Sequence, residues 1–271
     1  MGPMQRKVPV TDADKAKSYF KYYERETAQL DPAKLATVYG APMSSKGKIT
    51  FAERAKIFEP GFDDEKGYCV MKDGTGYISD SVFIPGGTAE MIDWFFGWRG
   101  LDPLRFVIEN PTTNISAVSM QTNFYEDEDR TPQEKNWDTT QVVLKSAGMG
   151  VKKEFLNFKC PLDVGFNGCE FGPDKEIKTF VCARNYADGY PPTAIPDYFI
   201  CHQVVDVEGG IEVRTRIWYG WTVRYGKNYK QLPDEFRMEP MVPKALMLEN
   251  AIEWANIAAI LPSLYAEEKD N

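Results

Sequence analysis

The chain has 271 residues, 43% of them apolar, which suits one large domain or a small domain joined to a larger one. A formal net charge of −8 argues against nucleic-acid binding, because phosphate binding needs a basic surface. No apolar run reaches the length of about 18 residues that would predict a membrane span. The aromatic share of 13% exceeds what an ordinary core needs, which predicts that some aromatic side chains line a ligand cavity.

The first third of the chain predicts helices and then an irregular segment. Residues 12–30 carry an apolar stripe at helical spacing. A second short helix is expected to begin at Pro32. Residues 41–85 are rich in Gly, Lys and Asp, with one short strand expected at Tyr68–Met71. We therefore expect residues 1–85 to form a small N-terminal helical subdomain or arm.

An aromatic helix and a strand are expected next. Thr88 is a suitable N-cap for a helix over residues 89–98. The apolar run Leu104–Glu109 predicts a strand. The polar and acidic stretch Gln121–Asp138 is expected to be a loop.

The rest of the chain predicts consecutive strands and a final helix. Gly209-Gly210 predicts a hairpin turn, and a terminal helix is expected over Lys244–Ile260. This order predicts an α+β fold, in which residues 86–271 form the ligand-cavity domain. The strands are expected at Thr139–Leu144, Lys153–Phe158, Ile177–Ala183, Tyr198–Val207 and Ile211–Tyr219.

The cysteines and the N-terminus indicate a reducing compartment. The five cysteines are odd in number, scattered along the chain and without CxxC spacing, which is typical of reduced thiols. No apolar segment follows the N-terminal residues 1–7, so no signal peptide is expected. We therefore expect a cytoplasmic protein.

Two stretches carry a family resemblance. Residues 91–114 combine an aromatic helix with an Asn-Pro turn, and the terminal helix ends in Leu261-Pro-Ser-Leu-Tyr265. Over residues 85–268 the chain resembles the phloretin hydrolase / 2,4-diacetylphloroglucinol hydrolase family of zinc-dependent C–C hydrolases. The resemblance implies a Bet v 1-like helix-grip domain, in which an antiparallel sheet wraps a long C-terminal helix and the ligand lies between them. It also suggests a homodimer.

The resemblance implies four metal-binding positions, and three of them differ here. The family binds zinc through a histidine after the Asn-Pro turn, a strand glutamate, and a histidine and a glutamate four residues apart on the terminal helix. The matching residues are Asn114, Lys145, Glu249 and Glu253, so only the last is kept. Their i, i+4 spacing places the two glutamates on one helix face. The alternative is a surface helix that carries two acidic residues.

The lysine argues against a metal ion. An ammonium group repels a dication and does not ligate it while it is protonated. We therefore expect no metal and no other cofactor. Lys145 would instead neutralise Glu249 and Glu253, either as a structural clamp or as an acid–base device with shifted pKa values.

His202 is the single histidine of the chain and lies on a predicted strand. The resemblance implies that it lies beside the substrate and assists protonation, whereas a lone strand histidine is otherwise a structural residue. Alternation along the strand places it on one face with Tyr198 and Ile200, and places Phe199 and Cys201 on the other.

Further residues are candidates for substrate contact. Trp94, Trp98 and Phe106 are expected either as apolar walls of the cavity or as ordinary core. Phe106 stands where the resemblance implies a tyrosine that contacts the substrate. Arg216 would orient a polar substrate group or pair with an acid. The candidates for substrate binding are Trp94, Trp98, Phe106, Asn114, Arg216 and Trp218.

Three functions remain open at this point. The first is a metal-independent enzyme that acts on a small aromatic or polycyclic ketone or phenol, such as a flavonoid or polyketide. Acid–base isomerisation, cyclisation or C–C cleavage would all suit it, with His202, Lys145, Glu249 and Glu253 as catalytic candidates. The second is a non-catalytic protein that binds such molecules, and the third is a zinc-dependent hydrolase with an altered site. Motifs of other enzyme classes, such as GxGxxG, GxSxG and HExxH, are absent from the sequence.

Overall fold

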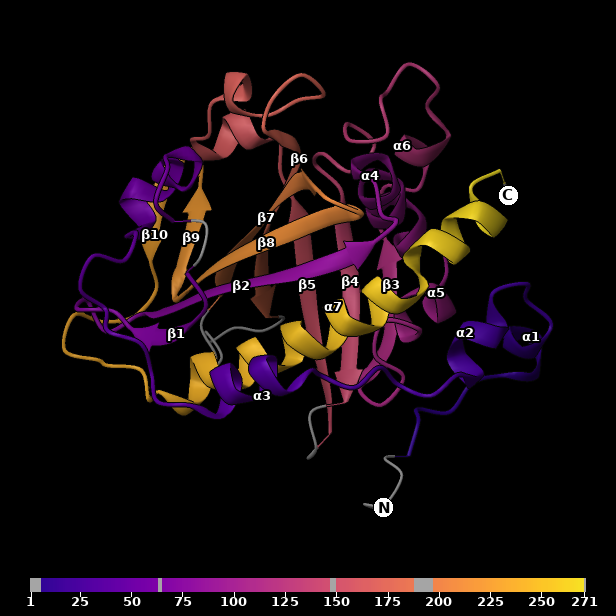
Figure 1. The fold of residues 1–271 in the computed structure, drawn as a ribbon, viewed down its shortest axis with the longest axis horizontal. Coiled ribbons are helices and arrows are strands. Elements are labelled where there is room, and N and C mark those ends of the chain that lie inside the picture. The colour runs from indigo at the N-terminus through magenta and orange to yellow at the C-terminus, as the bar shows by residue number, and fades with distance from the viewer. Residues whose placement is uncertain (1–5, 63–64, 147–149, 188–196, 271) are drawn as a thin grey trace.

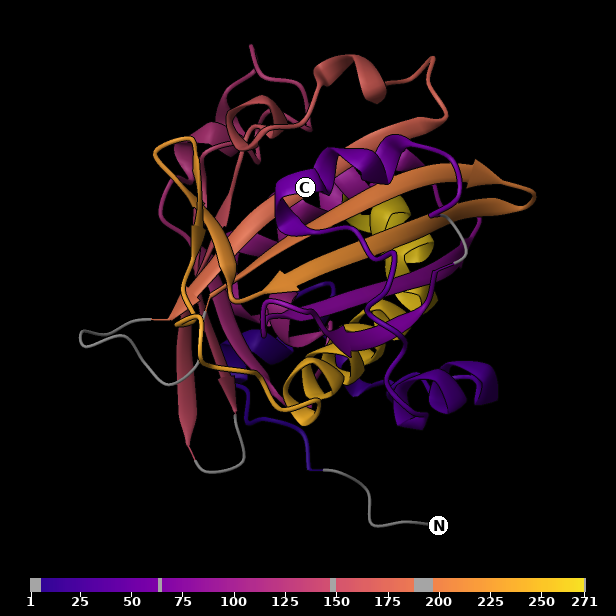
Figure 2. The same cartoon turned by 90° about the vertical axis from the view of Figure 1, so that its left-hand side faces the viewer.

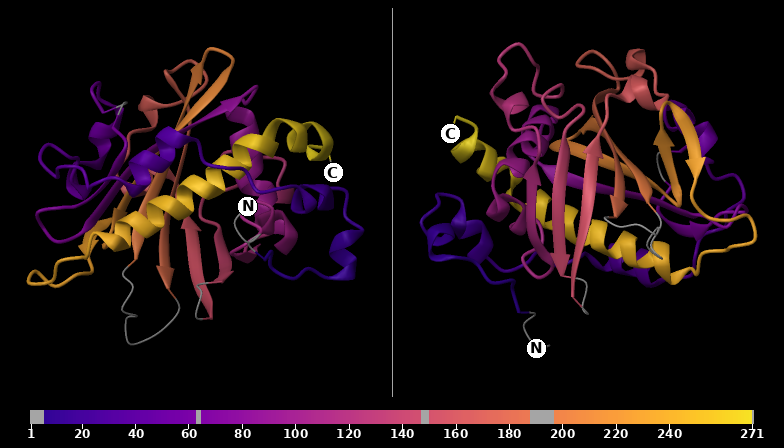
Figure 3. Two further views of the ribbon diagram at one scale, coloured as in Figure 1. Left: turned by 60° about the horizontal axis from the view of Figure 1, so that its bottom comes forward. Right: turned by 180° about the vertical axis from the view of Figure 1, so that it is seen from behind.

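The computed structural model describes residues 6–62, 65–146, 150–187 and 197–270. An eight-stranded antiparallel sheet curves around one long helix, α7 (Met241–Glu268), as Figure 1 and Figure 3 show. This is the helix-grip arrangement, so the predicted α+β fold class is confirmed. None of the helices in the described ranges is long and apolar enough to cross a bilayer.

The sheet has the strand order β1-β2-β8-β7-β6-β5-β4-β3. Most neighbours follow each other in sequence, but β2 pairs with β8 and so joins distant segments of the chain. A separate hairpin consists of β9 (Trp221–Arg224) and β10 (Lys227–Lys230). The strands of the main sheet are β1 (Gly67–Val70), β2 (Gly76–Pro85), β3 (Asn114–Ser119), β4 (Thr140–Ser146), β5 (Val151–Phe158), β6 (Ile177–Ala187), β7 (Tyr198–Val207) and β8 (Gly210–Tyr219).

The strands predicted in the second half of the chain are confirmed, whereas in the first half one predicted strand is wrong and strands β2 and β3 were not predicted. The hairpin at Gly209-Gly210 is confirmed, and Gly209 has a φ of +81°, which favours glycine. The strand predicted at Leu104–Glu109 is wrong, because helix α5 (Pro103–Val107) lies there. Asp102 caps this helix by accepting a hydrogen bond from the Leu104 backbone N–H, and Pro103 suits its first turn.

The helix predicted over residues 12–30 is interrupted. It consists of two short pieces, and the ammonium of Lys7 donates to the carbonyls of Tyr23 and Arg25 where the second piece ends. The helix predicted from Pro32 is confirmed, and α7 is longer than predicted, with Pro262 inside it. Apart from α5 and α7, the helices are α1 (Asp12–Lys15), α2 (Phe20–Glu24), α3 (Pro32–Tyr39), α4 (Ala89–Trp98) and α6 (Asn123–Glu126), and the 3₁₀ helices are η1 (Phe51–Phe58), η2 (Arg99–Leu101), η3 (Pro161–Val164) and η4 (Gly168–Glu170).

The N-terminal part of the chain is integrated with the sheet. Strands β1 and β2 belong to the main sheet, so the boundary expected after residue 85 coincides with the end of a strand that is paired on both sides. Helix α3 packs against α7, and α2 lies beside α5. Two side chains of the α2 segment, Lys21 and Tyr22, also bind Glu267 near the end of α7.

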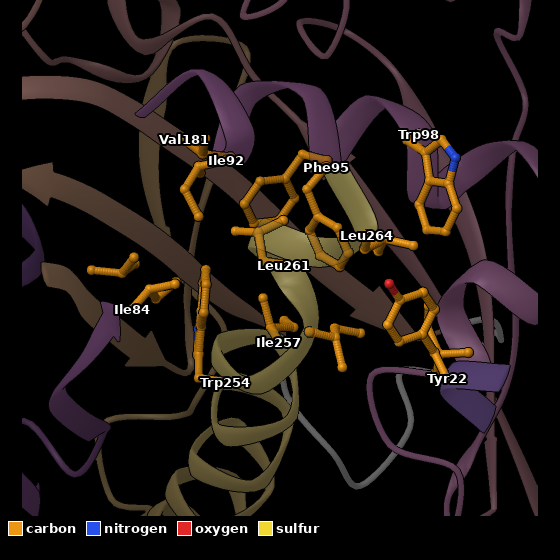
Figure 4. Close-up of a cluster of buried hydrophobic side chains, with 14 of the residues drawn as sticks. Tyr22, Ile84, Ile92, Phe95, Trp98, Val181, Trp254, Ile257, Leu261 and Leu264 are labelled. Carbon is orange, nitrogen blue, oxygen red and sulfur yellow. The ribbon is translucent and has the colours of Figure 1, made fainter. Parts of the chain in front are cut away.

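Each face of the sheet has its own core. We call the side that faces α7 the inner face and the opposite side the outer face; Figure 2 shows the strands arching past the helix. On the inner face, side chains of α4 and α7 pack between the helices and the sheet, among them Phe95, Trp254 and Ile257 (Figure 4). On the outer face, an aromatic cluster that includes Phe199 and Trp218 packs against η1.

Candidate functional site

A cavity lies between the inner face of the sheet and α7, where the helix-grip arrangement is expected to hold a ligand. Its volume is about 70 Å³, and its wall includes Phe106, Lys145, His202, Glu253 and Trp254. This space has room for a few water molecules. It is smaller than the roughly 300–1,000 Å³ of typical small-molecule sites, so a phenolic ligand requires some wall side chains to move.

The four residues implied as metal ligands meet around Lys145, and two of them, Lys145 and Glu253, line the cavity. The β3–β4 pairing places Asn114 directly opposite Lys145. The Lys145 ammonium lies 2.8 Å from Glu253 Oε1 and also contacts Glu249 Oε1, because the i, i+4 spacing aims both glutamates of α7 at it. Asn114 is fully buried and donates from Nδ2 to the carbonyl of Phe106 at 3.3 Å. The glycine-rich bend after Lys145 includes residues 147–149, which lie outside the described residues.

The charged groups of this cluster shift one another's pKa values. Burial alone would lower the pKa of Lys145, but the carboxylates of Glu249 and Glu253 outweigh burial and raise that pKa well above its ordinary value. Burial raises the pKa of Glu249, but Lys145 outweighs this and holds it below its ordinary value. At neutral pH the cluster therefore contains an ammonium between two glutamate side chains.

This donor set does not fit a zinc ion. Zinc sites in proteins use histidine nitrogen, cysteine sulfur and carboxylate oxygen as ligands. Here the amide of Asn114 is turned to a backbone carbonyl, and a cation occupies the space between the carboxylates. Among the described residues, no group of three or more His, Cys, Asp or Glu side chains is placed to hold a metal ion.

His202 lies in the cavity wall between two aromatic rings. Its ring stacks on Phe96 at a centroid distance of 5.6 Å and meets Trp254 edge-on at 5.1 Å. Its Nδ1 lies 2.8 Å from Thr215 Oγ1. Burial, and secondarily the nearby charge of Arg99, lower the pKa of His202 to about 3. The imidazole is therefore neutral at physiological pH, so it donates or accepts single hydrogen bonds rather than carrying charge.

With the fold and this geometry in place, comparison with known proteins identifies the family. The DAPG hydrolase PhiG domain family matches residues 49–266. The chain belongs to this family. Its similarity extends to phloretin hydrolase from Eubacterium ramulus, which is 33% identical over 269 residues, or 97% of this chain and 95% of that protein. A 2,4-diacetylphloroglucinol hydrolase from Pseudomonas sp is 23% identical over 263 residues, or 93% of this chain and 88% of that protein.

Solved structures with related architecture are more distant. The crystal structure of Ara h 8.0201 covers 70% of this chain and 99% of its own, with a TM-score of 0.45 and 7% sequence identity. A norcoclaurine synthase from Thalictrum flavum covers 66% of this chain and 85% of its own, with a TM-score of 0.36 and 14% identity.

The structure does not bring every predicted site residue of this DAPG hydrolase family member to the cavity. Trp94 and Trp98 stack on each other at 5.2 Å and line a separate groove beside the end of α7. Arg216 and Trp218 lie on the outer face, because β8 directs alternate side chains away from α7. Trp218 Nε1 donates to the carbonyl of Ile49 at 2.9 Å, and Arg216 donates to a backbone carbonyl.

The cavity also contains polar residues that sequence reasoning did not single out. One sequence signal for them is a charged residue inside an apolar run, as Glu109 is after Phe106-Val-Ile108. Such a residue is rarely buried without a specific reason. The additional polar residues of the wall are Arg99, Glu109, Glu154, Asn185, Tyr198 and Asn250.

Proposed function

We propose that this protein is a hydrolase that cleaves the carbon–carbon bond between a phenolic ring and its acyl group by acid–base chemistry without a metal ion. Membership of the family supports the reaction class, since the relatives are named as hydrolases of phloretin and of 2,4-diacetylphloroglucinol. The observation that carries the proposal is the ammonium of Lys145 held between Glu249 and Glu253 in the wall of an aromatic cavity.

The proposed reaction needs a positive charge and two proton transfers. Water adds to the ketone carbonyl, the bond to the ring carbon breaks, and the products are a phenol and a carboxylic acid. The Lys145 ammonium is suited to stabilise the oxyanion that forms on the carbonyl oxygen. Glu253, also in the cavity wall, is suited to accept a proton from the attacking water. Glu249 is the more exposed glutamate and holds Lys145 in place.

Isomerisation and cyclisation of related ketones use similar proton transfers. They differ from hydrolysis in the product, because only hydrolysis adds the elements of water. The decisive first measurement is therefore mass spectrometry of products after incubation with phloretin and, separately, with 2,4-diacetylphloroglucinol. Cleavage to a phenol and a carboxylic acid supports the proposal, and an isomeric product overturns it.

The role of Lys145 is tested with a matched pair of variants. Lys145→Met removes the ammonium from the cavity, and we expect kcat to fall about 10²–10³-fold, as for loss of an oxyanion-stabilising group. Lys17→Met is the control, because Lys17 also bridges two carboxylates, at 2.6 Å from Asp14 and 2.6 Å from Asp102, but is not part of the cavity wall. The control should keep full activity per folded molecule.

A loss of activity in Lys145→Met must be separated from a loss of folding. Breaking a buried ion pair costs about 3–5 kcal/mol, so the folded fraction is measured by circular dichroism, and Glu253→Gln serves as a milder second variant.

Two further results would contradict parts of the proposal. Stoichiometric zinc in the purified protein, with activity lost on chelation, would favour a zinc-dependent hydrolase. Tight binding of phloretin with no product after long incubation would favour a non-catalytic binding protein.

A further inference from the structure

A buried glutamate outside the lysine cluster faces the same cavity. Glu109 follows α5 and precedes the Asn110-Pro111 turn, and its backbone N–H donates to the carbonyl of Phe106 at 3.1 Å. Only 1% of the residue is exposed to solvent, and its side chain forms part of the cavity wall. The end of the helix and the turn therefore hold this carboxyl group at a fixed place in the wall.

The two oxygens of this carboxyl group have different surroundings. Oε2 accepts a hydrogen bond from Arg99 Nη1 at 3.1 Å, and Arg99 Nε in turn donates to Gln141 Oε1 at 3.1 Å, which fixes the guanidinium. Oε1 is buried and has no hydrogen-bond partner. Buried carboxyl oxygens normally have partners, so an unpaired one in a cavity wall is free to bind a ligand.

The surroundings of Glu109 favour its neutral form. Burial raises the pKa of Glu109 to about 8; Arg99 and Lys145 oppose this shift, and Glu253 adds to it. Because Arg99 donates to Oε2, the proton of the neutral acid belongs on Oε1. The titratable and charged groups that share the cavity wall with Glu109 are Arg99, Lys145, Glu154, Tyr198, His202 and Glu253.

We infer that Glu109 is a further catalytic residue, the general acid that protonates the ring carbon when the acyl group leaves. The inference rests on the proposed hydrolysis. Water gives one proton to Glu253 as its oxygen bonds to the carbonyl carbon. The C–C bond then breaks, its electron pair passes to the ring, and the ring carbon takes the proton from Glu109 Oε1. Transfer of the proton from Glu253 back to Glu109 restores both residues, and the products are the phenol and the carboxylic acid.

The test uses Glu109→Gln with phloretin as substrate. The introduced amide keeps the shape of the carboxyl group and accepts the hydrogen bond from Arg99, but it cannot supply the proton. We expect kcat/KM to fall about 10²–10⁴-fold. The acid works when protonated, so wild-type activity should fall as the pH rises through about 8, and this alkaline limb should be absent from the residual activity of the variant.

Asp93→Asn is the matched control. Burial raises the pKa of Asp93 to about 7, but this acid accepts a hydrogen bond from Thr179 Oγ1 at 2.6 Å and lines the separate groove beside the end of α7. The control should keep both the rate and the alkaline limb. If Asp93→Asn removes the limb, or Glu109→Gln keeps the wild-type rate and limb, the inference is overturned.

A purely structural role for Glu109 predicts a different pattern. It would lower the stability of the variants and leave the rate per folded molecule and the pH profile unchanged. Glu109→Asp keeps the acid but shortens the side chain, so we expect a lower kcat with the alkaline limb of the pH profile retained. A wild-type kcat in Glu109→Asp would overturn the inference. This test remains available if Glu109→Gln fails to fold. Loss of activity in Lys145→Met with no loss in Glu109→Gln would reject the role of Glu109 as general acid and leave the proposed hydrolysis unaffected. A wild-type protein that does not cleave phloretin would reject both the role of Glu109 and the proposed hydrolysis.

Discussion

The two faces of strands β7 and β8 differ sharply, although their residues alternate along the same chain. The outer face is aromatic, and Trp218 is buried there with its indole N–H bonded to a backbone carbonyl. On the inner face the apolar core is interrupted by the cavity with its charged groups and by His202. A step of one residue along a strand thus separates the packed aromatic face from the face that lines the cavity.

If the proposed hydrolysis is right, stability and chemistry are divided between the two faces of the sheet. Aromatic burial on the outer face holds the sheet against η1, and the rings of Phe51 and Trp218 pack at 5.8 Å. On the inner face, the carboxyl oxygen of Glu109 is buried without a hydrogen-bond partner, which costs stability. Substitutions on the two faces should therefore separate changes in stability from changes in activity.

The largest expected change in the free energy of unfolding comes from a substitution on the outer face of the sheet. Trp218→Ala removes a side chain that is 1% exposed and should lower the free energy of unfolding by about 3–5 kcal/mol. Trp221→Ala is the control, since Trp221 stacks on the same Phe51 ring but is only half-buried, and a smaller loss is expected. Urea unfolding measures both. Activity on phloretin per folded molecule should be unchanged in both variants, and a selective loss of kcat in Trp218→Ala would break the division between the faces.

An intermediate effect is expected on the pH dependence of stability when His202 is replaced. Its pKa is about 3 in the folded protein, so below pH 6.5 the unfolded chain binds a proton that the folded protein does not. The folded protein therefore loses stability as the pH falls from 6.5 toward 3, by about 3 kcal/mol at pH 4.5. We expect the difference in unfolding free energy between pH 7 and pH 4.5 to be smaller by that amount in His202→Gln. An unchanged pH dependence would show that the imidazole is not buried in its neutral form.

The smallest effect concerns the hydroxyl group beside that histidine. Thr215→Val removes the partner of His202 Nδ1 and should lower the unfolding free energy by about 1 kcal/mol. Thr222→Val is a matched control, because the Thr222 hydroxyl is buried without a partner, and its loss should be neutral or stabilising. Equal losses in the two variants, measured by urea unfolding, would contradict the pairing of Thr215 with His202.

Much of this division between faces could be predicted from the sequence. Alternation along Tyr198–Val207 places His202 with Tyr198 and Ile200 and apart from Phe199, and the structure confirms it. The family resemblance also led to a quartet that the structure brings together around Lys145, although the catalytic roles of its members stay predictions.

Other features depend on tertiary contacts that a sequence does not display. The apolar run Leu104–Glu109 suits a strand or a buried helix equally, and the signals that decided for a helix were Asp102 and Pro103. Strand β2 was missed because glycine, serine and aspartate interrupt its pattern, and its pairing with β8 supplies the missing stability. Glu109 Oε1 has no hydrogen-bond partner because no donor lies close enough to it, and only the three-dimensional structure shows this.

The pairing of β2 with β8 has a consequence for the order of folding. Neighbouring strands from β3 to β8 are close in sequence and can pair soon after they are synthesised, whereas β2 must wait for β8 near the end of the chain. Contacts between such distant segments carry a large loop-closure cost and slow folding. Since α7 follows β8, we expect the cavity to close in a late kinetic step of folding. In that step the wall that contains Glu109 and the helix that contains Glu253 come together.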